Sequence, residues 1–134
     1  MKIDFKHTGS AMIVTVFAVA IMAVLTIGIL QINTEELQIV RNQIYAAQAM
    51  AVAEAGLNDA FAQLRSNPNW NAGFTNKAFL GNSYTIVVTG SFPSLTIESI
   101  GTTSQGFVAK MTSDVTIGTS SPYVVRIDKL RINE

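Results

Sequence analysis

The chain has 134 residues, a formal net charge of zero, only 13% charged residues and no cysteine. Because soluble domains usually carry about a quarter charged residues, this chain is poor in charge. Without cysteine the chain has no disulfide framework or thiolate site. Its single histidine is His7, close to the N-terminus, so the folded domain has no histidine for a catalytic triad or a zinc site. The nine lysines and arginines are scattered singly, so no specific nucleic-acid site is evident.

The first predicted element is an apolar helix. Residues 11–30 carry no charge, and eleven of these twenty residues are Ile, Leu, Val or Phe. Twenty helical residues reach about 30 Å, which matches the hydrocarbon core of a bilayer. Lys2 and Lys6 precede the run, whereas Glu35 and Glu36 follow it, so the positive-inside rule places residues 1–9 in the cytoplasm and the rest of the chain outside.

Three interpretations of this run compete. A cleaved secretory signal would use Ala18-Val19-Ala20 as its cleavage motif, but the apolar run continues well past that point. A permanent signal anchor would simply hold the chain in the membrane. The third interpretation depends on the residues on either side of the run.

The helical pattern continues beyond the apolar run. Apolar residues recur at spacings of three, four and seven, and residues 43–62 contain eight alanines, the strongest helix former. No proline occurs before Pro68, so we expect one helix from Ser10 to Arg65 that ends at Ser66-Asn67-Pro68-Asn69. Gly28 is either a flexing point or a place of tight packing against another helix. The predicted apolar face comprises Ile39, Ala46, Met50, Ala53, Leu57, Ala60, Phe61 and Leu64.

The C-terminal half predicts a small antiparallel sheet of about four strands. Alternating apolar residues mark strands over residues 83–89, 95–100, 107–117 and 123–132, with Gly, Ser and Pro turns between them. In the last strand the apolar parity switches, which predicts a bulge or bend near Asp128-Lys129. We expect residues 67–82 to form a linking loop, with Trp70, Phe74 and Phe79 closing the interface between helix and sheet. The predicted fold class is α+β, with the sheet packed on residues 43–65 of the helix.

The sequence gives no support for an enzyme, a metal site or a cofactor. The acidic residues are isolated, and each is expected on a solvated surface; they are Glu54, Asp59, Glu98, Asp114 and Asp128. Glu54 interrupts an alanine-rich face, so it either bridges to a neighbouring subunit or is simply exposed. Glu54 and Asn58 are one helical turn apart and could share a hydrogen bond. No glycine-rich phosphate loop or nucleophile–base pair is present.

The order of these features resembles the type IV pilin superfamily. Lys6-His7-Thr8-Gly9 followed by Ser10-Ala11-Met12-Ile13-Val14 is similar to a prepilin-peptidase site, and the run Ala53-Glu54-Ala55-Gly56-Leu57 resembles a helix segment of PilX-like proteins. Major pilins typically have Phe and Glu at the first and fifth mature positions. Here those positions hold Ser10 and Val14, as in PilX-type minor pilins and the K-type pseudopilin of type II secretion.

The resemblance implies a filament subunit, of a pilus or a secretion pseudopilus, whose work is assembly. Residues 1–9 would be a leader, cut between Gly9 and Ser10 with methylation of the new amino terminus. Residues 10–32 would lie in the membrane and then in the filament core, residues 33–66 would be the amphipathic half of the helix, and residues 67–134 the sheet domain. The core helix residues would include Ala11, Val14, Phe17, Ala20, Val24 and Gly28.

The implied partners are other pilin subunits, prepilin peptidase, inner-membrane assembly machinery and the lipid bilayer. The absence of the glutamate favours a tip or minor subunit, since the family is thought to pair that carboxylate with the amino terminus of a neighbouring subunit. The alternative is a bitopic membrane protein with a small extracytoplasmic binding domain, unrelated to filaments and with an uncleaved leader.

Overall fold

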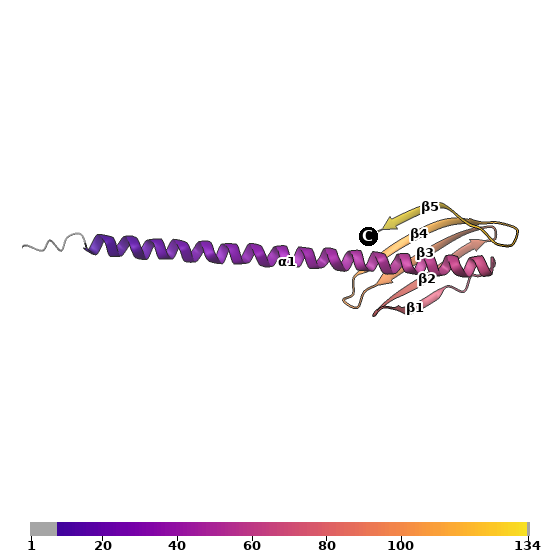
Figure 1. Cartoon of the computed structure of the whole chain (residues 1–134), viewed down its shortest axis with the longest axis horizontal. Helices are drawn as coiled ribbons and strands as arrows, with labels where there is room; N and C mark the ends of the chain where they lie inside the picture. The colour runs from indigo at the N-terminus through magenta and orange to yellow at the C-terminus, as the bar shows by residue number, and fades with distance from the viewer. Residues whose placement is uncertain (1–7, 134) are drawn as a thin grey trace, which may run out of the picture. The chain divides into compact units, whose positions relative to one another are not determined.

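The computed structural model describes residues 8–133, which form one helix followed by five strands (Figure 1). Residues 1–7 of the predicted leader 1–9 lie outside this described range. The chain divides into two units, the helix as far as Arg41 and the chain from Asn42 onward. The elements are α1 (Thr8–Ser66), β1 (Phe74–Phe79), β2 (Asn82–Ser91), β3 (Ser94–Thr102), β4 (Val108–Ile117) and β5 (Val125–Asn133).

Helix α1 confirms the expected continuous helix, with an extra residue or two at each end. It ends where the sequence predicts, because Pro68 disfavours helical backbone in the residue before it. The amide of Asn67 still donates to the carbonyl of Gln63 at 2.8 Å, and the amide of Trp70 then turns back to the carbonyl of Asn67 at 3.0 Å. Arg65 lies in the last turn, where a positive charge favours the negative end of the helix dipole.

The sheet is an antiparallel meander in the order β1-β2-β3-β4-β5, as its short connections predict. The number of strands differs from the expected four or so. Strand β1 lies inside the segment 67–82 that the sequence predicted as a loop. The sequence did not predict this strand because its side chains do not alternate between buried and exposed: all but Phe74 are exposed. Its register with β2 is also interrupted between Phe74 and Lys77.

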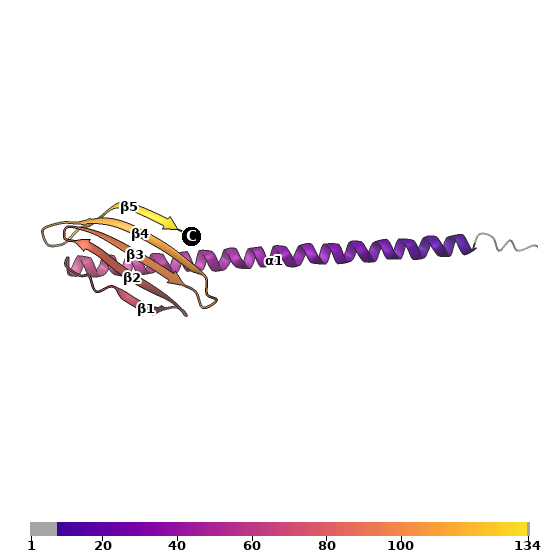
Figure 2. The same ribbon diagram turned by 180° about the vertical axis from the view of Figure 1, so that it is seen from behind.

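One face of the sheet packs on the second half of α1, and the other face is bare, as seen from behind in Figure 2. The predicted inward residues of the middle strands are confirmed as buried, apart from Val88, which is half-buried. From α1 the core takes residues at helical spacing between Val52 and Leu64. The inward residues of the middle strands are Tyr84, Ile86 and Val88 on β2, Leu95 and Ile97 on β3, and Ala109, Met111, Val115 and Ile117 on β4.

Helix and sheet approach most closely at β3. A Cβ atom added to Gly101 would lie 2.5 Å from the backbone nitrogen of Ala53, so only glycine fits there. Two residues before Gly101 on β3, the buried hydroxyl of Ser99 donates to the backbone carbonyl of Ala53 at 2.6 Å. The axis of α1 is therefore held close above the middle strand of the sheet.

Three expectations about apolar residues are corrected. Ile39 and Ala46 lie on the predicted apolar face of the helix but are exposed, because burial of α1 begins only at Ala49. Phe79 is also exposed, at the end of edge strand β1, although Trp70 and Phe74 do pack against the core as expected. Phe107, expected to begin the third of the four predicted strands, lies just before β4, and its ring packs against that of Tyr45 with centroids 5.3 Å apart.

The predicted bulge in the last strand is confirmed. Asp114 pairs with Lys129 and Val115 with Ile127, so Asp128 is the extra residue. The bulge explains the switch in parity, because it returns Leu130 to the same face of the sheet as Ile127.

Two buried serines give a matched test of the core. Ser99 and Ser113 are both fully buried on neighbouring strands, but among the described residues the hydroxyl of Ser113 has no hydrogen-bond partner. Ser99→Ala should lower the free energy of unfolding by about 1 kcal/mol, because a buried hydrogen bond is lost. Ser113→Ala should be neutral or stabilising, because it removes an unsatisfied buried group. Denaturant unfolding of the full chain in detergent micelles, followed by fluorescence of the single tryptophan Trp70, measures both. Equal destabilisation by the two changes would contradict the assigned hydrogen bond.

Candidate assembly surfaces

The first candidate surface is the apolar part of α1. Within residues 8–133, α1 is long and apolar enough to cross a membrane, by length and composition. Its side chains from residue 9 to 32 are exposed, apart from the partly covered Gly28. No charged residue occurs in the described helix before Glu35.

The side-chain hydroxyls within residues 11–30 form hydrogen bonds to carbonyls of the same helix. Residues 11–30 contain two hydroxyl side chains, Thr15 and Thr26. The first donates to the carbonyl of Met12 at 2.9 Å and the second to the carbonyl of Met22 at 2.8 Å. An unsatisfied donor in hydrocarbon costs several kcal/mol, so these internal bonds suit the segment to an apolar surrounding.

The structure places all the predicted processing and core residues on α1. Gly9 and Ser10 lie in its first turn and are exposed. Val14, Phe17, Val24 and Gly28 are spaced by three, seven and four residues, so they share one face of the helix, with Ala11 and Ala20 on either side of it. A Cβ atom added to Gly28 would meet nothing within 4 Å, so the glycine leaves open space on this face. The groove between Gly9 and Ala20 is shallow and lined by apolar residues, and it is no enclosed ligand site.

A polar cluster that the sequence did not predict joins α1 to the first two strands. Lys77 donates to Asp59 at 2.5 Å, and the hydroxyl of Tyr84 donates to the same carboxylate oxygen at 2.7 Å. The ammonium of Lys77 also lies 4.2 Å from the centre of the Phe74 ring. Sequence reasoning missed the cluster because Lys77 belongs to a strand that was expected to be a loop.

Electrostatics within this cluster favour the charged forms of Asp59 and Lys77 and the neutral form of Tyr84. Burial raises the pKa of the Asp59 carboxyl, but the hydrogen bonds from Lys77 and Tyr84 and the positive charge of Lys77 outweigh it, so the pKa lies below its ordinary value of 3.8. The hydrogen bond to Asp59 raises the pKa of Lys77 above 10.5. Burial, followed by the bond to Asp59, raises the pKa of Tyr84.

These shifts give a pH dependence with a defined sign. The contribution of Asp59 to stability is present above the ordinary pKa of 3.8 and is lost as pH falls through the lower folded value. The contribution of Lys77 to stability is present below pH 10.5 and is lost as pH rises through the raised pKa.

Asp59→Asn should therefore remove both the loss of stability at acid pH and the loss at alkaline pH. It should also lower the free energy of unfolding at neutral pH by about 1 kcal/mol. Denaturant midpoints measured across pH check this, with Glu54→Gln, an exposed neighbour, as the control. An unchanged acid and alkaline profile in Asp59→Asn would count against the cluster.

Three other acidic residues of the sheet are in ion pairs rather than simply solvated, Glu98 and Asp114 with a neighbouring strand and Asp128 within β5. Glu98 binds Lys110 at 2.6 Å, Asp114 binds Arg131 at 2.6 Å, and Asp128 binds Arg126 at 2.7 Å. Asp114 points to the bare face of the sheet, as predicted. Glu54 is exposed, and the structure shows no hydrogen bond between it and Asn58. Among the residues described, no three His, Asp or Glu side chains lie close enough together to hold a metal ion.

Two small hollows lie at the end of the sheet domain, near the turn after α1. They have volumes of about 240 and 230 Å³, and both are lined by Pro68, Asn69 and Phe92. Trp70 is a further lining residue of the first hollow, and Tyr123 of the second. Neither lining contains a charged residue, so these hollows offer rings, amides and hydroxyls but no acid–base pair.

The comparisons with known proteins give no relative. No protein-family model matches the chain, and no curated protein or solved structure is significantly similar to it.

Proposed function

We propose that this protein is a structural subunit of a type IV pilus-like filament or a secretion pseudopilus. The observation that supports this most is the continuity of α1. One unbroken helix carries an exposed, uncharged apolar segment at one end and, at the other, packs against an antiparallel meander. Its proposed work is assembly through the apolar segment, with no catalytic role for any side chain.

The chemistry of assembly is an exchange of lipid for protein contacts. Before assembly, residues 11–30 stay in the bilayer because their aliphatic side chains favour insertion by several kcal/mol in total. In the filament, the same side chains pack against equivalent helices. Gly28 and the alanines of the same segment, Ala11 and Ala20 among them, let helices approach closely, so that packing replaces lipid contact without exposing backbone.

The residue at position 14 points to a minor or tip position in the filament. Val14 is an exposed apolar residue on the proposed packing face. A carboxylate in this apolar surrounding is costly unless it is paired. A subunit with valine there offers no carboxylate to a neighbour's amino terminus, and a tip subunit, with no subunit ahead of it, needs none.

The proposed location is the inner membrane, with the sheet domain on the extracytoplasmic side before assembly and on a filament afterwards. The basic leader residues Lys2 and Lys6 and the later Glu35 and Glu36 support this orientation. The loops of the sheet domain, including the two hollows beside Phe92, are the proposed carriers of any adhesive or partner specificity.

Processing of the amino terminus tests this function directly. The chain isolated from its native envelope should begin at Ser10 with a methylated amino group, and only in cells that contain prepilin peptidase. Gly9→Val should leave residues 1–9 attached, whereas Ala11→Val, a change of similar size two residues away, should still be processed. Intact-mass and N-terminal peptide analysis measure both. A wild-type chain that keeps its leader would exclude the filament pathway and leave a membrane-anchored domain, and a chain that begins after Ala20 would identify a secretory signal.

The packing face of the apolar segment gives a second test. Gly28→Leu fills the open space on that face, so it should reduce the yield of sheared filaments by about tenfold or more while leaving membrane insertion intact. Val19→Leu, on the opposite side of the helix, is the matched control and should assemble normally. Equal yields from the two variants would show that this face is not the one that packs.

A further inference from the structure

The two hollows beside the turn after α1 share part of their walls, so they are direct neighbours. Pro68, Asn69 and Phe92 line both of them. Their volumes of about 240 and 230 Å³ together fall within the range of about 300 to 1,000 Å³ that is usual for ligand sites, whereas neither does so alone. A ligand made of two linked units suits such a shape. We call them the paired hollows.

Three aromatic side chains line the paired hollows: Trp70, Phe92 and Tyr123. The ring of Phe92 is common to both hollows and is 39% exposed. Trp70 and Tyr123 are partly buried and pack against the core, and the ring of Trp70 also lies 5.2 Å from that of Phe74. Two of the three rings are therefore held in place without a ligand, so binding costs little side-chain ordering.

Backbone hydrogen bonds fix the segments that carry these rings. The amide of Trp70 donates to the carbonyl of Asn67 at 3.0 Å, which closes the turn after α1. The amide of Ile117, at the end of β4, donates to the carbonyl of Pro93 at 2.8 Å, which ties the turn between β2 and β3 to the neighbouring strand. The walls of the paired hollows are thus formed by the fold itself.

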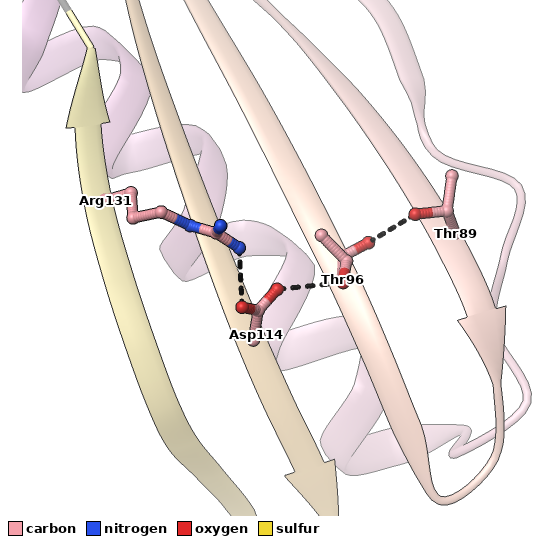
Figure 3. A network of polar contacts seen from close by, with 4 residues as sticks. All are labelled: Thr89, Thr96, Asp114 and Arg131. Atoms are coloured by element: carbon pink, nitrogen blue, oxygen red, sulfur yellow. Dashed lines mark hydrogen bonds and ion pairs between the residues drawn. The ribbon is translucent and has the colours of Figure 1, made fainter.

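The polar side chains around the rings have no partners, unlike those of the outer face of the sheet. On that face the strands satisfy one another, and Figure 3 shows Arg131 bound to Asp114, which also accepts a hydrogen bond from Thr96 at 2.9 Å. Four exposed polar residues line the paired hollows, and within residues 8–133 their side chains form no hydrogen bond with another residue. They are Asn69, Asn71, Ser91 and Thr119.

This lining matches the chemistry of an uncharged sugar. A pyranose ring has an apolar face of C–H groups, which packs on the apolar and slightly negative face of an aromatic ring. Hydroxyls surround its edge, and each of them donates and accepts hydrogen bonds, as do the amide of asparagine and the hydroxyls of serine and threonine.

Other ligand classes match the lining less well. Neither hollow has a charged residue in its lining, so a phosphate, a nucleic acid or an acidic sugar meets no cation to balance its charge. A proline-rich peptide also packs on aromatic rings, but its proline amides have no N–H group and would leave the accepting oxygens of the lining unused.

We propose that the paired hollows bind a neutral glycan, with the ring of Phe92 packed against a sugar ring where the two hollows meet. The inference rests on the proposed function and deepens it, because it names a ligand class for the loops that a filament would display. The position of the hollows suits this role. They follow the C-terminal end of α1, about 36 Å along the helix from Asn42, where the chain enters the domain.

Titration of the full chain with neutral disaccharides tests the site, because the single tryptophan, Trp70, lines it and reports binding by its fluorescence. The chain is purified from its native envelope in a detergent without a sugar head group, so that the detergent does not compete. The probes are lactose, maltose, cellobiose and N,N′-diacetylchitobiose, each at up to roughly tens of millimolar. We expect a saturable change in fluorescence with at least one of them. No saturable change with any of the four would overturn the proposal.

Two variants and one control place the binding in the paired hollows. Phe92→Ala should weaken binding about tenfold or more, because the ring is lost from both hollows. Asn69→Ala, which changes an exposed amide, should also weaken it and serves as a second variant in case Phe92→Ala disturbs folding. Phe79→Ala is the matched control and should bind as the wild type does, because Phe79 is 37% exposed but lies at the opposite end of β2. Unchanged binding in Phe92→Ala and Asn69→Ala, equal loss in Phe79→Ala, or a response to oligoproline and to no sugar would each overturn the proposal.

The leader is analysed by mass in the same samples, so that the two proposals fail separately. A processed chain that binds no sugar would overturn the glycan site and leave the filament function standing. An unprocessed chain that binds sugar through Phe92 would support the site but overturn the filament function, and an unprocessed chain without binding would overturn both.

Discussion

The closest contact between α1 and the sheet is made by residues without bulk. Gly101 leaves room for the backbone of Ala53, and the short side chain of Ser99 reaches the Ala53 carbonyl. Any larger residue at Gly101 would collide with backbone rather than with a flexible side chain, so the helix is held at one height and over one strand. The larger core residues, such as Leu64, Ile97 and Ile117, then fill the space on both sides of this seam.

Because one helix over the middle strand cannot cover five strands, both edges of the sheet remain open to solvent. The two edges deal with this differently. On β1, the charged Lys77 lies over the Phe74 ring and binds Asp59, so the edge is fastened to the helix by polar contacts. On β5, a bulge at Asp128 and three basic side chains make the strand a poor template for further strand pairing. Helix α1 leaves the aliphatic residues on the inner face of β5 about half exposed.

Helix α1 changes in composition along its length without a break in its helical backbone. Up to Leu30 it has no charged side chain among its described residues, and the hydroxyls of Thr15 and Thr26 donate to carbonyls of the same helix. From Ala49 onward its buried face includes four small residues, Ala49, Ala53, Gly56 and Ala60, which let the sheet approach at close range. Between them, residues 31–44 carry charged residues together with exposed aliphatic residues such as Leu37, Val40 and Ile44.

The sequence by itself determined the length of α1, the buried face of each middle strand and the bulge in the last strand. Those features follow from local rules: proline placement, apolar periodicity of 3.6 or 2, and a parity switch at Asp128. It also placed the candidate processing and core residues on one helix, because that placement needs only helical spacing. Only the tertiary structure decided that β1 is a strand, since its side chains are mostly exposed and it exists through pairing with β2. The cluster of Asp59, Lys77 and Tyr84 likewise depends on which strand lies under the helix. So does the exposure of the apolar residues Ile127, Leu130 and Ile132 on β5. That choice is made by the fit of Gly101 and Ser99 against Ala53, a contact between residues nearly fifty positions apart that no local pattern encodes.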